Sequence, residues 1–278
     1  MKDEALALAA AVSDPAGKLN LLREYLQALA LRSLHESEAF INLAFVGGTA
    51  LRFIAALPRF SEDLDFSLHQ PEGYQPIEWM KKIKTDLTLA GFEATVNWND
   101  RTTVHKAWIK VAGILKEVGL AAMPQQNLSI KLEIDTCPPG GAVLQRSLVT
   151  RHRLLALQHY DLASLMAGKI HALMTRGYPK GRDWYDLAWY RGHRPPLEPN
   201  LVQLQNALNQ TQGKDAPSAR DWRIHLFSRL ETIDTQALRN DIAPFLEHPK
   251  EADLLNRQNL QAMLDPHPLD AKNGNERA

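Results

Sequence analysis

Two aspartates, Asp63 and Asp65, have the spacing that points most directly to chemistry in this sequence. They stand in the segment FSEDLDFSL, whose second half alternates acidic and apolar residues with the two-residue period of a strand. Both carboxylates would then project from one strand face, where they repel each other unless a divalent cation such as Mg²⁺ lies between them. The spacing alone also fits a solvent-facing strand edge that carries two ordinary acids.

A glycine turn lies upstream of these aspartates. Residues 41–46 form a short apolar run that Gly47 and Gly48 stop, and the following TALRFIAAL is typical of a helix that Pro58 ends. The pattern predicts a strand, a glycine turn and a helix. Exposed backbone N–H groups at such a helix start bind phosphate, whereas the bland alternative is a tight connection between strand and helix.

A third carboxylate is available in the segment SIKLEID, residues 129–135. Strand alternation puts Lys131, Glu133 and Asp135 on one face and the apolar residues on the other. Glu133 lies in the middle of the strand, where its carboxylate would point into a cleft, so we favour it over Asp135. An exposed strand with a ladder of charged residues remains the alternative.

Lys169 occupies an unusual place, because it falls in the apolar stripe of a helix predicted over residues 161–175. An ammonium group there must either extend to solvent or reach an anion, such as a triphosphate or a carboxylate. Further along, Asp183 and Asp186 are three residues apart and share one face of a helix that begins near Gly181. Asp183 also fits an ordinary acid at a helix N-terminus.

Positive charge is concentrated in residues 146–194, which hold nine Lys and Arg and three acids, although the whole chain has 32 of each sign. Aromatic residues are interleaved with this charge, which is typical of a polyanion-binding surface. The alternative is a basic helix face balanced by acids elsewhere in the fold. The candidate RNA contacts are Arg151, Arg153, Arg176, Lys180 and Arg182.

The periodicity of the chain predicts the elements that must position these residues. Helices are expected at 18–34 and 76–90, and strands at 92–98, 104–111, 128–136 and 143–149. Helical spacing dominates later, at 161–176, 183–191, 199–210, 220–231 and 235–247. The prediction is an α+β fold: an α/β domain with a mixed sheet and an N-terminal helix over 1–154, a helical domain over 155–264, and a flexible tail at 265–278.

Composition narrows the class of protein. The 278 residues, 45% of them apolar and 23% charged, exclude a disordered chain and a coiled coil. No apolar run reaches the roughly 20 residues that span a bilayer, and acids in the first residues argue against a signal peptide, so we expect a cytoplasmic protein without membrane contact. The single cysteine, Cys137, excludes an internal disulfide.

Four segments in order, VGGTALR, RFSEDLDF, KIHAL and RDWYDL, closely resemble the AbiEii/AbiGii nucleotidyltransferase-like toxin family, and they cover about residues 41–191. The resemblance implies a DNA-polymerase-β-like nucleotidyltransferase core, followed by a variable helical part. It also implies the toxin of a bacterial toxin–antitoxin or phage-defence pair. Such an enzyme would use Mg²⁺ to transfer NMP from a nucleoside triphosphate to RNA, above all the 3′ end of tRNA, with release of pyrophosphate, and a cognate antitoxin would be its partner.

Carried over by motif, the resemblance assigns roles to individual residues. Gly47, Gly48 and Thr49 become the phosphate-facing turn, with Ser61 and Lys169 in the nucleotide-binding set; Asp63 and Asp65 become metal ligands; Asp183 becomes an essential acid. The resemblance does not choose between Glu133 and Asp135 as the third metal ligand, and we take Glu133 from its place in the strand. Gly48 stands where the wider superfamily usually has serine. Two other functions stay open: transfer to a protein or small-molecule hydroxyl, and binding of a partner without catalysis.

Overall fold

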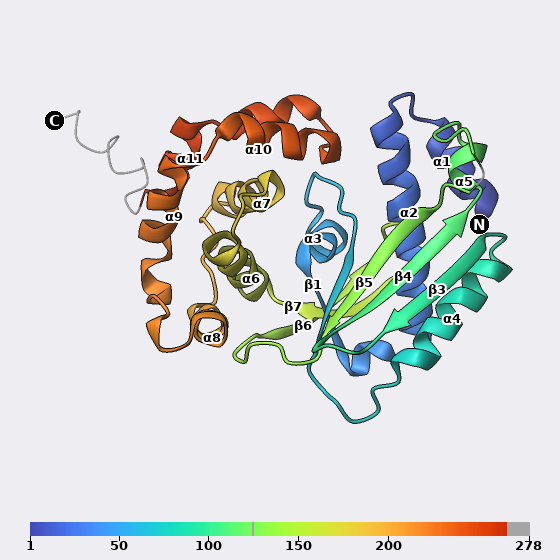
Figure 1. Ribbon diagram of the computed structural model, residues 1–278, viewed down its shortest axis with the longest axis horizontal. Coiled ribbons are helices and arrows are strands. Elements are labelled where there is room, and N and C mark those ends of the chain that lie inside the picture. The colour runs from blue at the N-terminus through green and yellow to red at the C-terminus, as the bar shows by residue number, and fades with distance from the viewer. Residues whose placement is uncertain (124, 266–278) are drawn as a thin grey trace. The chain divides into compact units, whose positions relative to one another are not determined.

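The chain folds into two compact units in a computed structural model that describes residues 1–123 and 125–265. Unit 1 comprises Met1–Pro138 and Val143–Asp161, and unit 2 comprises Pro139–Ala142 and the chain from Leu162 onward. Figure 1 shows the strands gathered in the first and helices alone in the second. Of the tail predicted at 265–278, all but Asp265 lies outside the described residues.

Unit 1 is built on a sheet whose strand order, over the described residues, is β3-β4-β5-β2-β1-β7-β6. The strands are β1 (Leu43–Val46), β2 (Leu64–Leu68), β3 (Glu93–Asn99), β4 (Val104–Ala112), β5 (Leu128–Asp135), β6 (Leu144–Val149) and β7 (Leu155–Tyr160). The pairs β1–β7 and β2–β5 are parallel, and the other neighbours are antiparallel. The predicted mixed sheet is confirmed.

The helices of unit 1 are α1 (Lys2–Ala10), α2 (Pro15–Glu36), α3 (Gly47–Ala55), α4 (Pro76–Leu89) and the short α5 (Ile114–Glu117). Helices α2, α3 and α4 pack on this sheet. Helix α2 begins where the sequence provides a start signal: the Asp14 side chain accepts a hydrogen bond of 2.7 Å from the Gly17 N–H, and Pro15 occupies the first helical position. Helix α3 contacts β1, β2 and β6.

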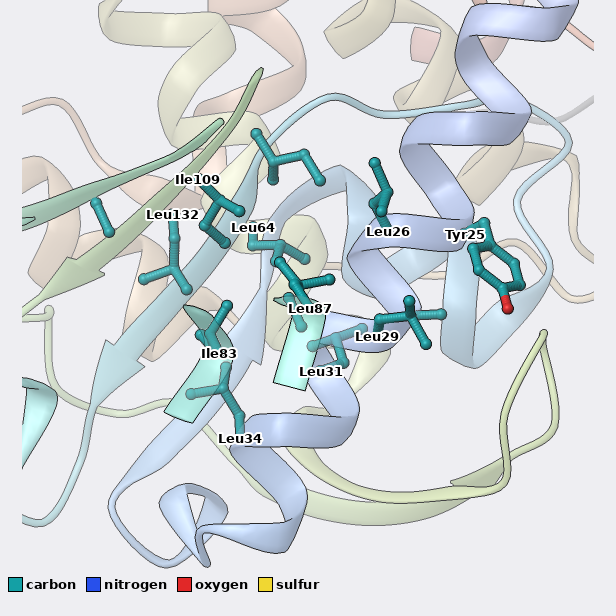
Figure 2. Close-up of a cluster of buried hydrophobic side chains, with 14 of the residues drawn as sticks. Tyr25, Leu26, Leu29, Leu31, Leu34, Leu64, Ile83, Leu87, Ile109 and Leu132 are labelled. Carbon is teal, nitrogen blue, oxygen red and sulfur yellow. The ribbon is translucent and has the colours of Figure 1, made fainter. Parts of the chain in front are cut away.

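The core of unit 1 lies between the sheet and the helices α2 and α4. Figure 2 shows leucines of α2 meeting Ile83 and Leu87 of α4 and the side chains of Leu64, Ile109 and Leu132 from three strands. Strand alternation explains this face, because every second residue of β5 is buried. Each such side chain stabilises the fold by about 1.5–3 kcal/mol relative to exposure, so the register of β5 is strongly specified.

Unit 2 is built mainly of helices over its described residues. Its helices are α6 (Leu162–Thr175), α7 (Gly181–Gly192), α8 (Leu201–Gln212), α9 (Trp222–Glu231), α10 (Thr235–Ile242) and α11 (Arg257–Leu264). Helix α6 packs on α7, α8 and α9, while α7 also contacts α10 and α11. Trp184, Tyr190 and Trp222 are buried in this packing. The helical region predicted after the sheet is confirmed.

Several elements differ from the sequence expectations. Strand β7 lies at 155–160, inside the segment assigned to the helical domain, because Leu155 and Leu157 are buried in the sheet and the strand pairs with β6. The helix expected over 235–247 ends at Ile242, just before Pro244, whose ring disfavours continuation. Helices α1, α5 and α11 were not predicted.

A membrane-spanning helix is absent from the part of the chain that the structure describes, because none of its helices combines the necessary length with the necessary apolar character.

Candidate active site

The two aspartates of the predicted metal site lie at the start of β2. Asp63 directly precedes the strand and Asp65 is its second residue, and both are half-buried. Leu64 and Phe66 point into the core, so alternation directs the carboxylates to the opposite face. Strand β5 runs parallel to β2, and Glu133 is the register partner of Asp65. The sheet therefore places Asp65 and Glu133 at the same level on adjacent strands.

Asp135, the alternative third carboxylate, lies two residues further along β5, opposite Ser67. Its Oδ1 accepts a hydrogen bond of 2.9 Å from the Cys137 N–H, so this side chain holds the turn that follows the strand. The register thus places Glu133, and not Asp135, directly opposite Asp65.

Lysines share this face of the sheet with the acids. The Nζ of Lys131 lies 2.8 Å from Oε1 of Glu133, and the Nζ of Lys106 lies 3.6 Å from the same oxygen. Burial alone would lower the pKa of Lys131, but the hydrogen bond to Glu133 and the negative charges of Glu133, Asp63 and Asp65 raise it above its ordinary value. Lys131 is therefore a fixed positive charge beside the carboxylates.

The donor set fits a hard divalent cation through the two aspartates. Among residues 1–123 and 125–265, no group of three or more His, Cys, Asp or Glu side chains is placed to hold a metal ion. Glu133 pairs with Lys131 and Lys106, and Asp63 and Asp65 add two carboxylates from the adjacent strand segment. Mg²⁺ commonly binds through one or two carboxylates and completes its shell with water and substrate phosphates.

The predicted glycine turn lies against the aspartate strand. Gly47 has a φ of +79°, and a Cβ at this position would lie 2.5 Å from Oδ2 of Asp65. A Cβ on Gly48 would lie 2.5 Å from Nη2 of Arg59 and 3.0 Å from the Ser61 hydroxyl. Only glycine permits this approach, which brings the first turn of α3 to the Asp65 carboxylate. The residue before the turn provides no side-chain cap for the N–H groups of α3.

Thr49 and Gln27 fix the segment that carries the aspartates. The buried Thr49 hydroxyl donates a hydrogen bond to the backbone carbonyl of Asp63, so it anchors this segment to α3. From α2, the buried Gln27 amide donates to the carbonyls of Ser61 at 3.1 Å and Glu62 at 2.9 Å. Residues 61–63 are therefore held by two helices, and the side chain of Thr49 faces protein.

A buried ion network fixes α3 itself. Glu24 of α2 is 3% exposed and lies 2.5 Å from Nε of Arg52 near the end of α3, 3.0 Å from Nη1 of Arg151 and 2.9 Å from Nε2 of His152. Burial alone would raise the pKa of Glu24, but the hydrogen bonds and positive charges of these partners hold it at about 2. Arg151, a predicted RNA contact, is therefore part of this internal network.

Arg153, another predicted RNA contact, also has internal partners. Its guanidinium lies 2.8 Å from Oε2 of Glu4, donates to the Tyr25 hydroxyl, and stacks over the Tyr25 ring at 5.0 Å from the centroid. The ion pair with Glu4 and the hydrogen bond to Tyr25 tie α1 and α2 to the segment between β6 and β7. Sequence reasoning could not find these partners, because they are separated from Arg153 by more than a hundred residues.

In unit 2, Lys169 lies in the apolar stripe of α6, and its ammonium group contacts two carboxylates. Its Nζ lies 2.9 Å from Oδ1 of Asp183 and 2.9 Å from Oδ2 of Asp186, both on α7. Arg176 also pairs with Asp183. Asp186 is completely buried, so the two cations balance two acids that would otherwise be costly to bury. Lys169, Arg176, Asp183 and Asp186 form one cluster, which we call the α6–α7 charge cluster.

The aromatic residues of the basic segment are mainly core. Trp184 and Tyr190 are fully buried and Tyr185 nearly so, since helical spacing turns them toward the packing of α7. Tyr178 is 59% exposed, and the charged groups of Arg176 and Lys180 lie 6.0 and 5.8 Å from its ring centroid. Arg182 stacks instead over the Phe245 ring, at 4.4 Å from its centroid.

The sequence analysis did not identify Gln27, Glu24 or Arg59 as parts of the site. Gln27 and Glu24 lie on the predicted N-terminal helix, where single polar residues among leucines give no sign of their partners. Arg59 is 1% exposed, but its position in the sequence, between Pro58 and the aspartate segment, does not indicate that its side chain is buried. It donates to the Phe60 carbonyl at 2.8 Å and packs beneath Gly48.

Comparisons with known proteins agree with this architecture. A family model described as "Nucleotidyl transferase AbiEii toxin, Type IV TA system" matches residues 29–272. The fold is similar to that of MenT4, a nucleotidyltransferase toxin from Mycobacterium tuberculosis H37Rv, with 18% identity, a TM-score of 0.57, and 97% of this chain and 91% of that chain covered. A putative nucleotidyltransferase from H. pylori gives 18% identity and a TM-score of 0.54, over 91% and 94% of the two chains. No curated protein matches.

Proposed function

Because the chain belongs to the AbiEii family of nucleotidyltransferase toxins of type IV toxin–antitoxin systems, we propose that it transfers a nucleoside monophosphate from a nucleoside triphosphate to RNA. The proposed acceptor is the 3′ end of tRNA, and the proposed metal is Mg²⁺. The family also implies an antitoxin as partner. Since tRNA and nucleoside triphosphates are cytoplasmic, the proposal places the protein in the cytoplasm.

One observation carries the proposal: the N-terminus of helix α3 lies against Asp65 of strand β2. The closeness of Gly47 to Asp65 brings the first N–H groups of α3, which bind phosphate well, beside carboxylates suited to a divalent cation. Glu133 and Lys131 on β5 extend this group. A triphosphate needs both features, since its oxygens must be held and its charge neutralised.

In the proposed reaction, an acceptor hydroxyl attacks the α-phosphorus, a new P–O bond forms, and the bond to the leaving pyrophosphate breaks. Asp63 and Asp65 would hold the divalent cation, which supplies charge neutralisation at the phosphates. The N–H groups of Gly48 and Thr49 bind phosphate oxygens, and Lys131 adds positive charge beside the carboxylates. We assign Glu133, the register partner of Asp65, as the third carboxylate, either as a further metal ligand or as the group that takes the proton of the attacking hydroxyl.

Residues of unit 2 complete the proposal. The family resemblance assigns Lys169 to the nucleotide phosphates and Asp183 to an essential acid, and these two residues share an ion pair. Arg176, Lys180 and Arg182 remain proposed RNA contacts. Arg151 and Arg153 are expected to act mainly through the fold, because Arg151 pairs with the buried Glu24 and Arg153 donates to the hydroxyl of the buried Tyr25.

Transfer is tested with purified wild type and the double variant Asp63→Asn/Asp65→Asn. Each α-labelled nucleoside triphosphate is incubated in turn with the protein, Mg²⁺ and total bacterial RNA, and the products are separated on a denaturing gel. The proposal expects label on a tRNA-sized band with wild type and none with the variant. Label on protein, or on RNA with both proteins, contradicts it. Far-UV circular dichroism of the variant controls for folding.

A further inference from the structure

The polar face of strands β3, β4 and β5 carries an exposed tryptophan next to the candidate active site. Trp108 lies on β4, in register with Asn97 of β3 and Lys131 of β5. It is 44% exposed, although its neighbours along the strand, Ala107 and Ile109, are buried in the core of unit 1. Strand alternation therefore holds a large aromatic ring on the face opposite the core.

Lysines flank this ring on both sides along the same strand. Lys106 and Lys110 stand two residues before and after Trp108, so they share its face, and Lys131 stands beside it on β5. On β3, the exposed Asn97 and Asn99 continue the surface. We name this surface, formed by Asn97, Asn99, Lys106, Trp108, Lys110 and Lys131, the Trp108 face.

The Trp108 face leads directly to the carboxylates. Lys106 is in register with Glu133, and Glu133 is in register with Asp65 on the next strand. Neighbouring strands are about 4.8 Å apart, and β5 lies between β4 and β2. The backbone of β4 at Trp108 is therefore only about 10 Å from the backbone of the segment that carries the aspartates. An RNA strand whose 3′-terminal hydroxyl reaches the aspartates would have its preceding nucleotides over this surface.

From these observations we propose that the Trp108 face binds the unpaired 3′ strand of the RNA acceptor, with a nucleobase stacked on Trp108 and phosphates on the lysines at either side. This inference rests on the proposed function. An aromatic ring between cations suits a polynucleotide, because each base in a strand has a phosphate on both sides. A single nucleoside triphosphate carries its phosphates on one side only. The base must be unpaired, since stacking on a side chain requires a base outside a duplex.

Binding is tested with the full chain and a fluorescently labelled, single-stranded oligoribonucleotide, by anisotropy. The variants are Trp108→Ala, Trp108→Phe and, as a control of similar exposure on α9, Phe227→Ala; Phe227 is 40% exposed. We expect Trp108→Ala to weaken binding about tenfold, which is about 1.4 kcal/mol, while Trp108→Phe and Phe227→Ala stay within about twofold of wild type. Lys110→Gln should lower the salt dependence of log Kd by a slope of about 1. Equal affinity of Trp108→Ala and wild type, or no binding by wild type, overturns the proposal.

Transfer kinetics separate this inference from the function on which it rests. In the transfer reaction, Trp108→Ala should raise the KM for RNA about tenfold and leave the KM for the nucleoside triphosphate unchanged. A raised KM for the triphosphate alone overturns the RNA assignment and places the nucleotide base on Trp108. If wild type transfers label and Trp108→Ala does so with unchanged constants, only the inference fails. If wild type transfers none but binds RNA through Trp108, only the proposed function fails. Thermal unfolding shows whether the variants are folded.

Discussion

Replacement of Glu24 by glutamine should destabilise unit 1 and change its response to acid. The pKa of Glu24 falls from an ordinary 4.5 to about 2, which corresponds to about 3 kcal/mol of stabilisation. Because the folded-state pKa is lowered, this stabilisation is present above pH 4.5 and is lost as the pH falls from 4.5 toward 2. Glutamine keeps the size of the side chain but leaves the buried Arg52 without its carboxylate, so Glu24→Gln should cost about 3 kcal/mol at neutral pH.

Glu4 provides a matched control for this prediction. Hydrogen bonds from Arg153 and Tyr25 hold its pKa at about 2 as well, yet its side chain is 49% exposed. Solvent screens the charge there, so Glu4→Gln should cost well under about 1 kcal/mol. The assay is urea unfolding followed by far-UV circular dichroism at neutral pH and at several acidic values. Between pH 4.5 and 2, the free energy of unfolding should fall less for Glu24→Gln than for wild type. At neutral pH, the loss of stability caused by Glu24→Gln should persist in high salt, because buried charges are little screened. Equal, small effects of the two substitutions would refute the reasoning.

Three further substitutions test the groups around the site. Gly47→Ala should abolish transfer and destabilise the protein more than Gly119→Ala does, as measured by thermal unfolding. Both glycines have a positive φ, but only Gly47 lies against Asp65. Gly119 has open space around it, so Gly119→Ala should cost about 1 kcal/mol. Thr49→Val removes one buried hydrogen bond and should cost about 1 kcal/mol, whereas an unchanged unfolding temperature would speak against its anchoring role. Lys169→Met removes one of the two cations that balance the buried Asp183 and Asp186, so it should cost about 3 kcal/mol, which Lys169→Arg should partly restore. A stable Lys169→Met protein would contradict the charge balance in the α6–α7 charge cluster.

Local periodicity predicted most of the elements around the site. The alternation around Asp65 and Glu133 fixed which face each carboxylate occupies, because a strand has one side-chain period and one face must be buried. The glycine turn could likewise be placed between a strand and a helix from its neighbours. What the alternation could not provide was the pairing of strands: that β5 lies beside β2, with Glu133 opposite Asp65, depends on the assembly of the whole sheet.

Partners that are distant in sequence account for what was not predicted. Glu24 meets Arg151 across more than a hundred residues, and no local pattern reports such an encounter. Trp184 and Tyr190 belong to a basic segment, but their place on α7 turns them into core residues. Trp108, in contrast, is exposed, because it alternates along β4 with the buried Ala107. The residues beside it on the adjacent strands, Asn97 and Lys131, depend on the pairing of the strands and not on any local pattern.

The central claim, nucleotidyl transfer to RNA at Asp63 and Asp65, is tested most directly by following the two ends of the triphosphate in parallel. Wild type and Asp63→Asn/Asp65→Asn are incubated with RNA, Mg²⁺ and the accepted nucleoside triphosphate, labelled either at the α- or at the γ-phosphate. The account predicts that wild type attaches the α-label to RNA and releases the γ-label as pyrophosphate, and that the variant does neither. Attachment of the γ-label to RNA or protein, or of the α-label to protein, would contradict it.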